Sequence, residues 1–293
     1  MNYQEKLKAF NPKHNYFIGI DSDGCVFDTM EIKQKQFFIP NALKYFELTG
    51  FEEVVRETWE FVNLYSVHRG GNRFISLIRV FDYLRERKEI LEAAINIPSL
   101  ESLKDWVKKE TKLSNTTLRE HIESHGDDEL ELVLQWSEKI NSDIESGLNR
   151  IPPFPHAHEA LKDLAPLADI VIVSQTPLEA LEREWEENNI RQYARLIAAQ
   201  EHGTKAEHIK YAAVGKYPDA NIIMIGDAKG DQAAARENNI LFYPVIPGKE
   251  DLSWQRFLKE GKNRFFMRTY SGEYENKLHS EFELSLPSRP FWQ

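Results

Sequence analysis

The sequence contains a single cysteine, Cys25, among its 293 residues. One thiol cannot form a disulfide within the chain, so a small secreted scaffold held together by disulfides is excluded. No apolar run approaches the length of a transmembrane helix, and the first 15 residues lack the apolar core of a signal peptide. These absences predict a cytoplasmic protein in a reducing compartment.

Basic residues are fewer than acidic ones. The chain has 37 Lys and Arg against 47 Asp and Glu, which gives a net charge of −10. Such an excess of acid repels phosphate backbones and anionic lipids, so we expect neither nucleic acid nor a membrane surface as a general partner. A small basic pocket for an anionic substrate is compatible with this balance.

Five short apolar runs predict buried strands, at residues 16–20, 169–173, 194–198, 221–225 and 240–245. Runs without polar alternation are typical of strands that are buried on both faces of a parallel sheet. Helical patterns separate the last four runs, as in right-handed βαβ units. The sequence therefore predicts an α/β fold with a Rossmann-like parallel-sheet core.

Residues 29–150 have helical periodicity instead of strand character. Long amphipathic patterns occupy residues 31–48, 52–67, 72–90 and 129–148, and Pro40 is expected to kink or interrupt the first of them. We expect an all-α domain inserted after the first strand. The expected division is a core of residues 1–28 and 153–250, a helical cap domain of residues 29–152, and a C-terminal extension, 251–293, that packs on the core.

Two acids directly follow the first strand, in the stretch "IGIDSDG" that contains Asp21 and Asp23. A calcium loop of the EF-hand type is excluded, because glycine is fourth in the loop and the twelfth residue is Ile32 instead of Glu. An Asp-Gly hairpin is disfavoured, because no matching strand follows Gly24. Capping of the next helix by Asp21 is the structural alternative.

Polar residues also follow two other predicted strands. Ser174 directly follows the run at 169–173. Gly226 and Asp227 follow the run at 221–225, and Asp231 lies four residues after Asp227. Lys205 lies between the two runs, near the start of a predicted helix. Ligands of open parallel sheets bind at the carboxyl ends of the strands, so we expect these groups to share one site.

This set of motifs resembles the haloacid dehalogenase superfamily of phosphatases and phosphotransferases. The four motifs are "IGIDSDG", Ser174 in "VIVSQT", Lys205, and "GDAKGD", and the resemblance covers about residues 15–28 and 153–247. A helical insertion after the first strand corresponds to the C1 cap of that superfamily. Ala206 stands where proline commonly follows the motif lysine, so Lys210 is an alternative to Lys205.

The resemblance implies a Mg²⁺-dependent phosphatase that hydrolyses a small organic phosphomonoester through an aspartyl-phosphate. Asp21 would be the nucleophile, and Asp23 would act as general acid and base. Ser174 and Lys205 would bind the phosphoryl group. The implied Mg²⁺ ligands are Asp21, the backbone carbonyl of Asp23, Asp227 and Asp231. Asp231 is equally compatible with a purely structural role as an acid in the first turn of a helix.

One stretch of the predicted cap is a candidate for substrate recognition. In capped members of the superfamily the loop that faces the core selects the substrate, and "VHRGGNRF" at 67–74 resembles that loop. Arg69 and Arg73 would then bind the anionic part of a small phosphorylated metabolite. An ordinary turn between two helices explains the same stretch equally well.

Several other functions share parts of this pattern of residues with the phosphatase. A sugar phosphomutase uses the same core groups and stays open, and a catalytically idle binding protein of the same fold is the second alternative. A dehalogenase is disfavoured, because halide departure does not need the acid at Asp23. A signalling receiver domain is disfavoured, because its phosphorylated acid follows the third strand, whereas Asp21 follows the first. A cysteine phosphatase is excluded, because Glu31 stands where its motif requires Arg, and His156 and His158 are more typical of a helix start than of a metal site.

Overall fold

The computed structural model describes residues 3–148 and 150–293. The chain divides into two compact units. The first, which we call the α/β unit, comprises Met1–Met30 and Arg150–Leu286. The second, which we call the helical unit, comprises Glu31–Asn149 and Pro287–Gln293.

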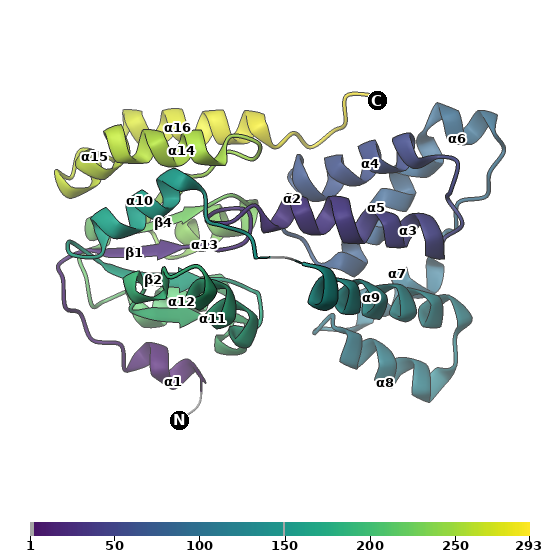
Figure 1. Ribbon diagram of the computed structural model, residues 1–293, viewed down its shortest axis with the longest axis horizontal. Coiled ribbons are helices and arrows are strands. Elements are labelled where there is room, and N and C mark those ends of the chain that lie inside the picture. Colours follow the sequence, from purple (N-terminus) through teal and green to yellow (C-terminus); the bar gives the residue numbers. More distant parts are fainter. Residues whose placement is uncertain (1–2, 149) are drawn as a thin grey trace. The chain divides into compact units, whose positions relative to one another are not determined.

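The α/β unit contains a five-stranded parallel sheet with the order β3-β2-β1-β4-β5, of which β1, β2 and β4 are labelled in Figure 1. The strands are β1 (Phe17–Ile20), β2 (Asp169–Val173), β3 (Leu196–Ala198), β4 (Ile222–Gly226) and β5 (Leu241–Pro244). Each of the five predicted apolar runs overlaps one of them, which confirms the α/β fold class. Phe17 is in register with both Asp169 and Ile222, so β1, β2 and β4 end at the same edge.

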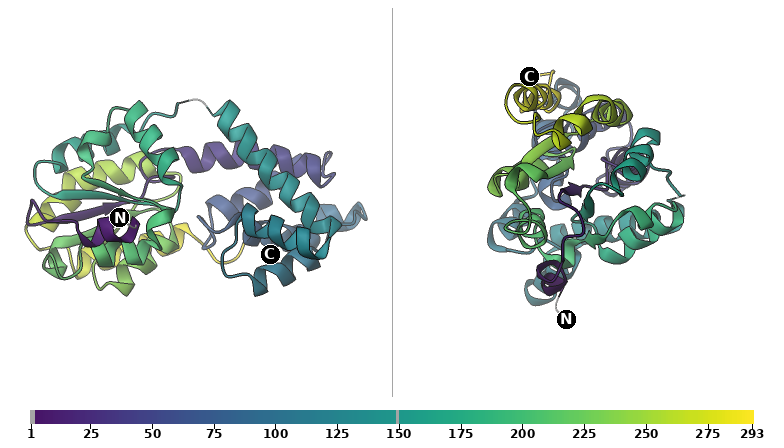
Figure 2. Two further views of the ribbon diagram at one scale, coloured as in Figure 1. Left: turned by 90° about the horizontal axis from the view of Figure 1, so that it is seen from below. Right: turned by 90° about the vertical axis from the view of Figure 1, so that its left-hand side faces the viewer.

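Helices cover both faces of this sheet (Figures 1 and 2). One face packs against α10 (Pro155–Leu164), α11 (Leu178–Glu187) and α14 (Glu250–Arg256). The other packs against α1 (Tyr3–Lys8), α12 (Lys205–Ala212) and α13 (Lys229–Glu237). This two-sided cover explains why the strands are apolar throughout. The remaining helices are α15 (Lys262–Phe266), α16 (Glu273–Ser285), the 3₁₀ turns Arg191–Tyr193, Gln200–His202 and Asp219–Asn221, and the π-helical turn Phe257–Gly261.

The helical unit is built from the predicted amphipathic segments and from further helices that lie between them. Its long helices are α4 (Glu52–Leu64), α5 (Arg73–Glu86) and α9 (Asp128–Gly147). The helices α6 (Lys88–Glu92), α7 (Glu101–Lys109) and α8 (Asn115–His125) follow α5. Their apolar faces enclose a separate core around Trp59 and Trp136, both almost fully buried.

The interruption predicted at Pro40 takes the form of a π-helical turn. The chain passes from α2 (Thr29–Lys33) through the π-helical turn Gln34–Phe38 into α3 (Ile39–Tyr45). Proline has no N–H group, and its ring crowds the carbonyl four residues earlier, so an α-helical bond cannot form there. The wider turn just before Pro40 relieves this crowding without ending the helix.

The C-terminal extension differs from the expectation in its last seven residues. Residues 251–286 belong to the α/β unit, but Pro287–Gln293 belong to the helical unit. There the ring of Trp292 packs edge-on against Phe61 at 5.3 Å and Tyr83 at 6.4 Å, and the guanidinium of Arg87 lies 4.5 Å from its centre. The expectation that all of 251–293 packs on the core is therefore wrong for 287–293, because this aromatic contact holds them elsewhere.

The described residues contain no helix that is both long and apolar enough to span a membrane.

Candidate active site

The loop after β1 is folded back tightly on itself. The backbone N–H of Asp21 donates to the carbonyl of Ile225 at 3.0 Å, which extends the pairing of β1 with β4 by one residue. The carbonyl of Ser22 then accepts from the amides of Cys25, Val26 and Phe27. Gly24 has a φ of 76°, a left-handed conformation that favours glycine. The loop thereby holds Asp21 at the carboxyl edge of the sheet, where only 5% of the residue is exposed.

Three buried carboxylates meet at this edge. Oxygens of Asp21, Asp227 and Asp231 all lie within 4.8 Å of one another, and no other such group of potential metal ligands occurs in the described residues. Asp227 follows β4, and Asp231 is the third residue of α13. A Cβ added to Gly226 would lie 2.3 Å from Cγ of Asp231, so glycine is needed at the end of β4 for this approach.

Lys205 is the cation of this cluster. Its Nζ lies 2.9 Å from Oδ2 of Asp21 and 2.6 Å from Oδ1 of Asp231. Thr204 caps α12 through the backbone N–H of Glu207, which places Lys205 at the first position of the helix. The alternative lysine, Lys210, is exposed. The geometry therefore favours Lys205 as the motif lysine.

The cluster carries more negative charge than its lysine can balance. Burial raises the pKa of Asp21 well above its usual range, Lys205 opposes this, and the neighbouring acids add to it. Burial likewise raises the pKa of Asp231. Burial alone would lower the pKa of Lys205, but Asp21 and Asp231 outweigh it and raise that pKa. Three carboxylates with one ammonium group are a fitting set of oxygen ligands for a divalent cation such as Mg²⁺.

Asp231 also has the structural role that the sequence left open. Its Oδ2 accepts from the backbone N–H of Ala228 at 3.0 Å, which closes the first turn of α13, while its Oδ1 accepts from Lys205. The same carboxylate thus stabilises the helix start and joins the acid cluster.

Asp23 is held by two threonines instead of by the acid cluster. One carboxylate oxygen accepts from the hydroxyl of Thr176 at 2.6 Å, and the other accepts from the hydroxyl of Thr29. Asp23 is half-buried, in contrast to the buried Asp21. Neither threonine was singled out in the sequence, although Thr176 lies only two residues beyond the motif residue Ser174.

Ser174 is almost fully buried at the end of β2. Its backbone N–H donates to the carbonyl of Ala198 at 2.9 Å, and its hydroxyl oxygen accepts from the backbone N–H of Thr176 at 3.1 Å. This hydrogen bond ties Ser174 to the threonine that contacts Asp23. Ser174 therefore belongs to the same edge of the sheet as the acids.

Arg69 and Arg73 lie in the helical unit. Arg69 is 3% exposed, and its Nη1 donates to the carbonyl of Leu64 at 3.0 Å, at the end of α4. Nη1 of Arg73 donates to the carbonyl and hydroxyl oxygens of Ser137 and to Oδ1 of Asn141. Residues 67–74 therefore form an ordered turn, in which Asn72 caps α5.

The guanidinium of Arg73 has an unusual environment for an arginine. It lies 5.1 Å from the centre of the Phe38 ring, and burial lowers its pKa to about 10. No carboxylate of the described residues lies within ion-pair distance of Arg73 in this structure. Its positive charge is thus held by neutral partners only.

The two histidines and the cysteine that the sequence set aside lie outside the acid cluster. Nδ1 of His156 lies 2.7 Å from the carboxylate of Asp251, at the start of α10. The ring of His158 packs near Tyr193. Cys25 is fully buried, and burial raises the pKa of its thiol well above its usual range, which disfavours a reactive thiolate.

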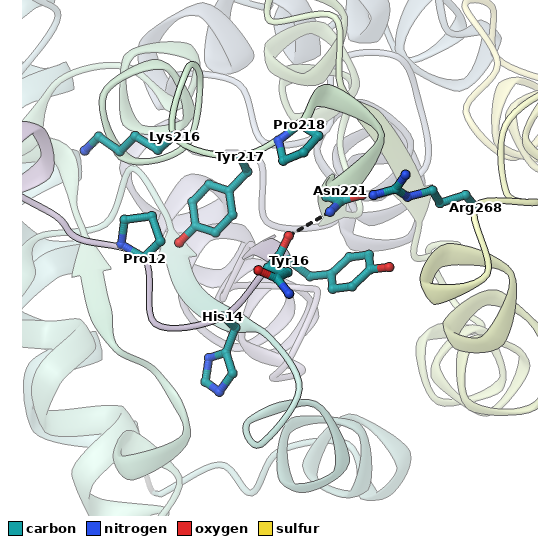
Figure 3. Close-up of a pocket in the computed structure, with 9 residues that line it drawn as sticks. Pro12, His14, Tyr16, Lys216, Tyr217, Pro218, Asn221 and Arg268 are labelled. Carbon is teal, nitrogen blue, oxygen red and sulfur yellow. Dashed lines mark hydrogen bonds between the residues drawn. The ribbon is translucent and has the colours of Figure 1, made fainter.

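A cavity of about 320 Å³ opens at the other edge of the sheet (Figure 3). It is lined by residues that precede β1 and β4, including Tyr16 and Asn221. Much of its polar lining is hydrogen-bonded within the fold: Lys216 donates to three backbone carbonyls, and Tyr217 donates to Asp169. None of its lining residues is acidic, so this cavity is not the site that the motifs describe.

The sequence matches a family of hydrolases. The model of the haloacid dehalogenase-like hydrolase family matches residues 86–245, which is more than half of the chain. No curated protein matches the chain significantly.

The chain is also similar to solved structures from several bacteria. A "predicted phosphoglycolate phosphatase" from Haemophilus somnus has 14% identity and a TM-score of 0.48, over 80% of this chain and 88% of that one. A hydrolase from Pseudomonas syringae has 14% identity and a TM-score of 0.46, over 85% and 99%. A haloacid dehalogenase-like protein from Streptococcus pneumoniae has 17% identity and a TM-score of 0.43, over 82% and 90%.

Proposed function

Because the chain belongs to the haloacid dehalogenase-like hydrolase family, we propose that it is a Mg²⁺-dependent phosphatase that hydrolyses a small organic phosphomonoester. The observation that carries the proposal is the buried cluster of Asp21, Asp227 and Asp231 with Lys205 bridging two of its acids. A phosphate dianion repels a carboxylate nucleophile, and such a site offers the cations that offset this repulsion.

Asp21 is the proposed nucleophile. An oxygen of its carboxylate attacks phosphorus, the bond to the leaving oxygen breaks, and an aspartyl-phosphate forms that water then hydrolyses. The backbone bond from Asp21 to Ile225 and the contact with Lys205 fix the carboxylate in place before substrate arrives. This preorganisation reduces the entropy that must be lost in the reaction.

Asp23 is the proposed general acid and base. It would protonate the leaving oxygen in the first step and accept a proton from water in the second. Its hydrogen bonds with Thr29 and Thr176 orient the carboxylate and leave it partly exposed. Contact with solvent suits a group that must exchange a proton in every cycle.

Lys205 and Ser174 are proposed to bind the phosphoryl oxygens. The carboxylates of Asp21 and Asp227, with Asp231 and the backbone carbonyl of Asp23, would hold Mg²⁺. When bound, the ion would neutralise charge on the phosphoryl group. The charge of Lys205 also favours the carboxylate form of Asp21, and so opposes the burial that raises the pKa of this group.

The helical unit is proposed to act as the cap that selects the substrate. Arg73 is the stronger of the two arginine candidates, since its charge is held by neutral partners and has no carboxylate of the described residues at ion-pair distance. Such a guanidinium would bind a carboxylate or a second phosphate of an anionic metabolite. Arg69, which donates to the backbone at the end of α4, would instead shape the turn.

The test is a screen of the purified protein, with Mg²⁺, against sugar, nucleotide and small-acid phosphates. Both phosphate release and formation of an isomeric phosphate are measured, because the second product would identify a phosphomutase. We expect release of phosphate that EDTA abolishes and Mg²⁺ restores. Ca²⁺ should substitute poorly, because it takes more ligands at longer distances. Full activity in chelator would contradict the proposal.

A further inference from the structure

Two buried tryptophans donate hydrogen bonds to the loop that carries Asp21 and Asp23. Nε1 of Trp185 lies 3.0 Å from the hydroxyl oxygen of Ser22, the residue between the two acids. Nε1 of Trp254 lies 2.7 Å from the backbone carbonyl oxygen of Cys25. Both side chains are fully buried. The loop is therefore hydrogen-bonded to two indole N–H groups of residues that lie outside it.

The two indoles come from separate parts of the chain. Trp185 lies in α11, which follows β2, and Trp254 lies in α14, in the C-terminal extension. Both belong to the apolar cluster on one face of the sheet, together with Phe27 of the loop. The Trp185 ring packs edge-on against Phe27, with 5.9 Å between ring centres. The loop thus packs on a buried apolar cluster and is hydrogen-bonded to two of its indoles.

We propose that Trp185 and Trp254 are positioning residues that fix residues 21–28 in the geometry in which Asp21 attacks phosphorus. The inference rests on the proposed phosphatase function. It assigns α14 a task that the sequence left open, namely to support the nucleophile loop. Neither indole touches the reacting atoms, so both act through the backbone of the loop.

Catalysis is sensitive to this kind of support. A nucleophile that is misplaced by about 1 Å can lose on the order of 100-fold in rate. An indole N–H bond to a buried carbonyl also resists opening, because the carbonyl left without a partner is costly in an apolar surrounding. Loss of one indole N–H should therefore loosen the loop more than it loosens the whole fold.

The experiment replaces each tryptophan by phenylalanine, which keeps an aromatic ring but removes the N–H donor. Trp136→Phe in the helical unit is the matched control. Trp136 is also fully buried, and its indole N–H has no acceptor among the described residues. Ser22→Ala removes the acceptor for Trp185, so it should match Trp185→Phe, and the double variant should add little.

The first readout is the labelling rate of Cys25 by a disulfide reagent such as 5,5′-dithiobis(2-nitrobenzoate). Cys25 is the only cysteine in the sequence and is fully buried within the loop, so its labelling reports loop opening directly. We expect Trp254→Phe and Trp185→Phe to label about ten-fold faster than wild type, and Trp136→Phe to label at the wild-type rate once global stability is matched.

The second readout is steady-state kinetics on the best substrate of the screen. We expect kcat to fall about ten-fold in both loop variants, with KM little changed, because the loss concerns alignment more than binding. Lower thermal stability with wild-type labelling and wild-type kcat would overturn the inference, since both tryptophans would then be ordinary core residues. If the wild-type protein is active and kcat is unchanged in both tryptophan variants, the inference is also overturned, even if Cys25 is labelled faster.

The two readouts separate this inference from the proposed function. If the wild-type protein releases no phosphate from any compound, the phosphatase proposal fails. The labelling rates then still decide whether the indoles hold the loop. Wild-type labelling rates in both variants would overturn the positioning role whatever the activity.

Discussion

At the scale of single residues, the site combines full burial with a surplus of acid. Burial raises the pKa of Asp21, whereas Lys205 and the backbone N–H of Ser22, which donates to Oδ1 at 2.8 Å, favour its ionised form. The sequence placed Asp21, Asp227 and Asp231 at the ends of neighbouring strands through its D-x-D-G and G-D-x-x-x-D motifs, and the structure brings their carboxylates together, while their catalytic and metal-binding roles stay predictions. It could not predict Trp185 and Trp254, because a hydrogen bond from a distant indole to a loop leaves no pattern in the spacing of residues.

The first prediction concerns Asp21. Asp21→Asn keeps the size of the side chain and removes the nucleophilic charge. Activity should fall by about three orders of magnitude or more, as removal of a covalent nucleophile does. The free energy of unfolding should be unchanged or higher, because one buried acid of a crowded cluster is neutralised. Phosphatase assays and urea denaturation check the two parts, and rapid turnover by a well-folded variant would refute the assignment.

The second prediction concerns the glycine before Asp227. In Gly226→Ala the new methyl group would lie 2.3 Å from Cγ of Asp231, so that carboxylate must leave its present position beside Lys205. Activity should fall by about 100-fold, and the protein should lose stability. Gly230→Ala is the control, because its added Cβ meets nothing within 4 Å. It lies in α13 and should be neutral or stabilise by up to about 1 kcal/mol. Equal activities of the two variants would contradict the argument.

The third prediction concerns Arg73. Arg73→Gln keeps hydrogen-bonding capacity and removes the charge. For an anionic natural substrate we expect kcat/KM to fall about 30-fold, since a charged hydrogen bond is worth about 2 kcal/mol. Turnover of a generic aryl phosphate should barely change, because that compound offers no second anion. The measured quantity is the ratio of the two specificity constants. If both substrates respond alike, the turn at 67–74 has no part in specificity.

At the scale of elements, the strands were more predictable than the helices of the second unit. Each strand is a short apolar run because it is buried on both faces, and that pattern is unambiguous. The helices α7 and α8 were not singled out: α7 buries only Leu103 and Trp106, and α8 buries only Leu118. So few buried residues give a weak periodic signal. The π-helical turn before Pro40 shows that a proline can be predicted to disturb a helix without the form of the disturbance being known.

The fourth prediction concerns α12, the helix that begins with Lys205. It also carries His208, which is fully buried, and burial, with smaller effects from His202 and Lys205, lowers the pKa of His208 to about 4. The neutral form is therefore favoured in the folded state, whereas the unfolded chain titrates near 6.5. The free energy of unfolding that the depressed pKa of His208 contributes is complete above pH 6.5 and is lost as the pH falls towards 4. The loss should reach about 3 kcal/mol.

The measurement is urea denaturation at several pH values between 7 and 4 for wild type and His208→Leu. The slope of the unfolding free energy against pH is compared between the two proteins. A loss of stability in the variant that is the same at every pH does not change this slope. The wild-type slope should exceed that of the variant throughout this interval. Parallel curves would mean that His208 does not titrate abnormally.

At the scale of the whole molecule, the described residues form three buried apolar clusters, one on each face of the sheet and one in the helical unit. The chain passes between the units at residues 30–31, 149–150 and 286–287. The switch from strand to helix patterns in the sequence predicted the helical insertion, and this insertion accounts for the passages at 30–31 and 149–150. It did not predict the third, because "LPSRPFWQ" has no periodicity, and the contact of Trp292 depends on residues more than 200 positions away.

The fifth prediction follows from that third passage. Trp292→Ala removes a half-buried ring that contacts Phe61, Tyr83 and the guanidinium of Arg87, so the helical unit should lose about 2 kcal/mol of stability. Hydrogen exchange should accelerate in α4 and α5 and stay unchanged in the five-stranded sheet. Phe291→Ala is the comparison: that side chain is 78% exposed, but its ring packs edge-on against Trp292 at 5.0 Å, so we expect a smaller effect than that of Trp292→Ala. Equal exchange in both variants would mean that residues 287–293 add nothing to the stability of the helical unit.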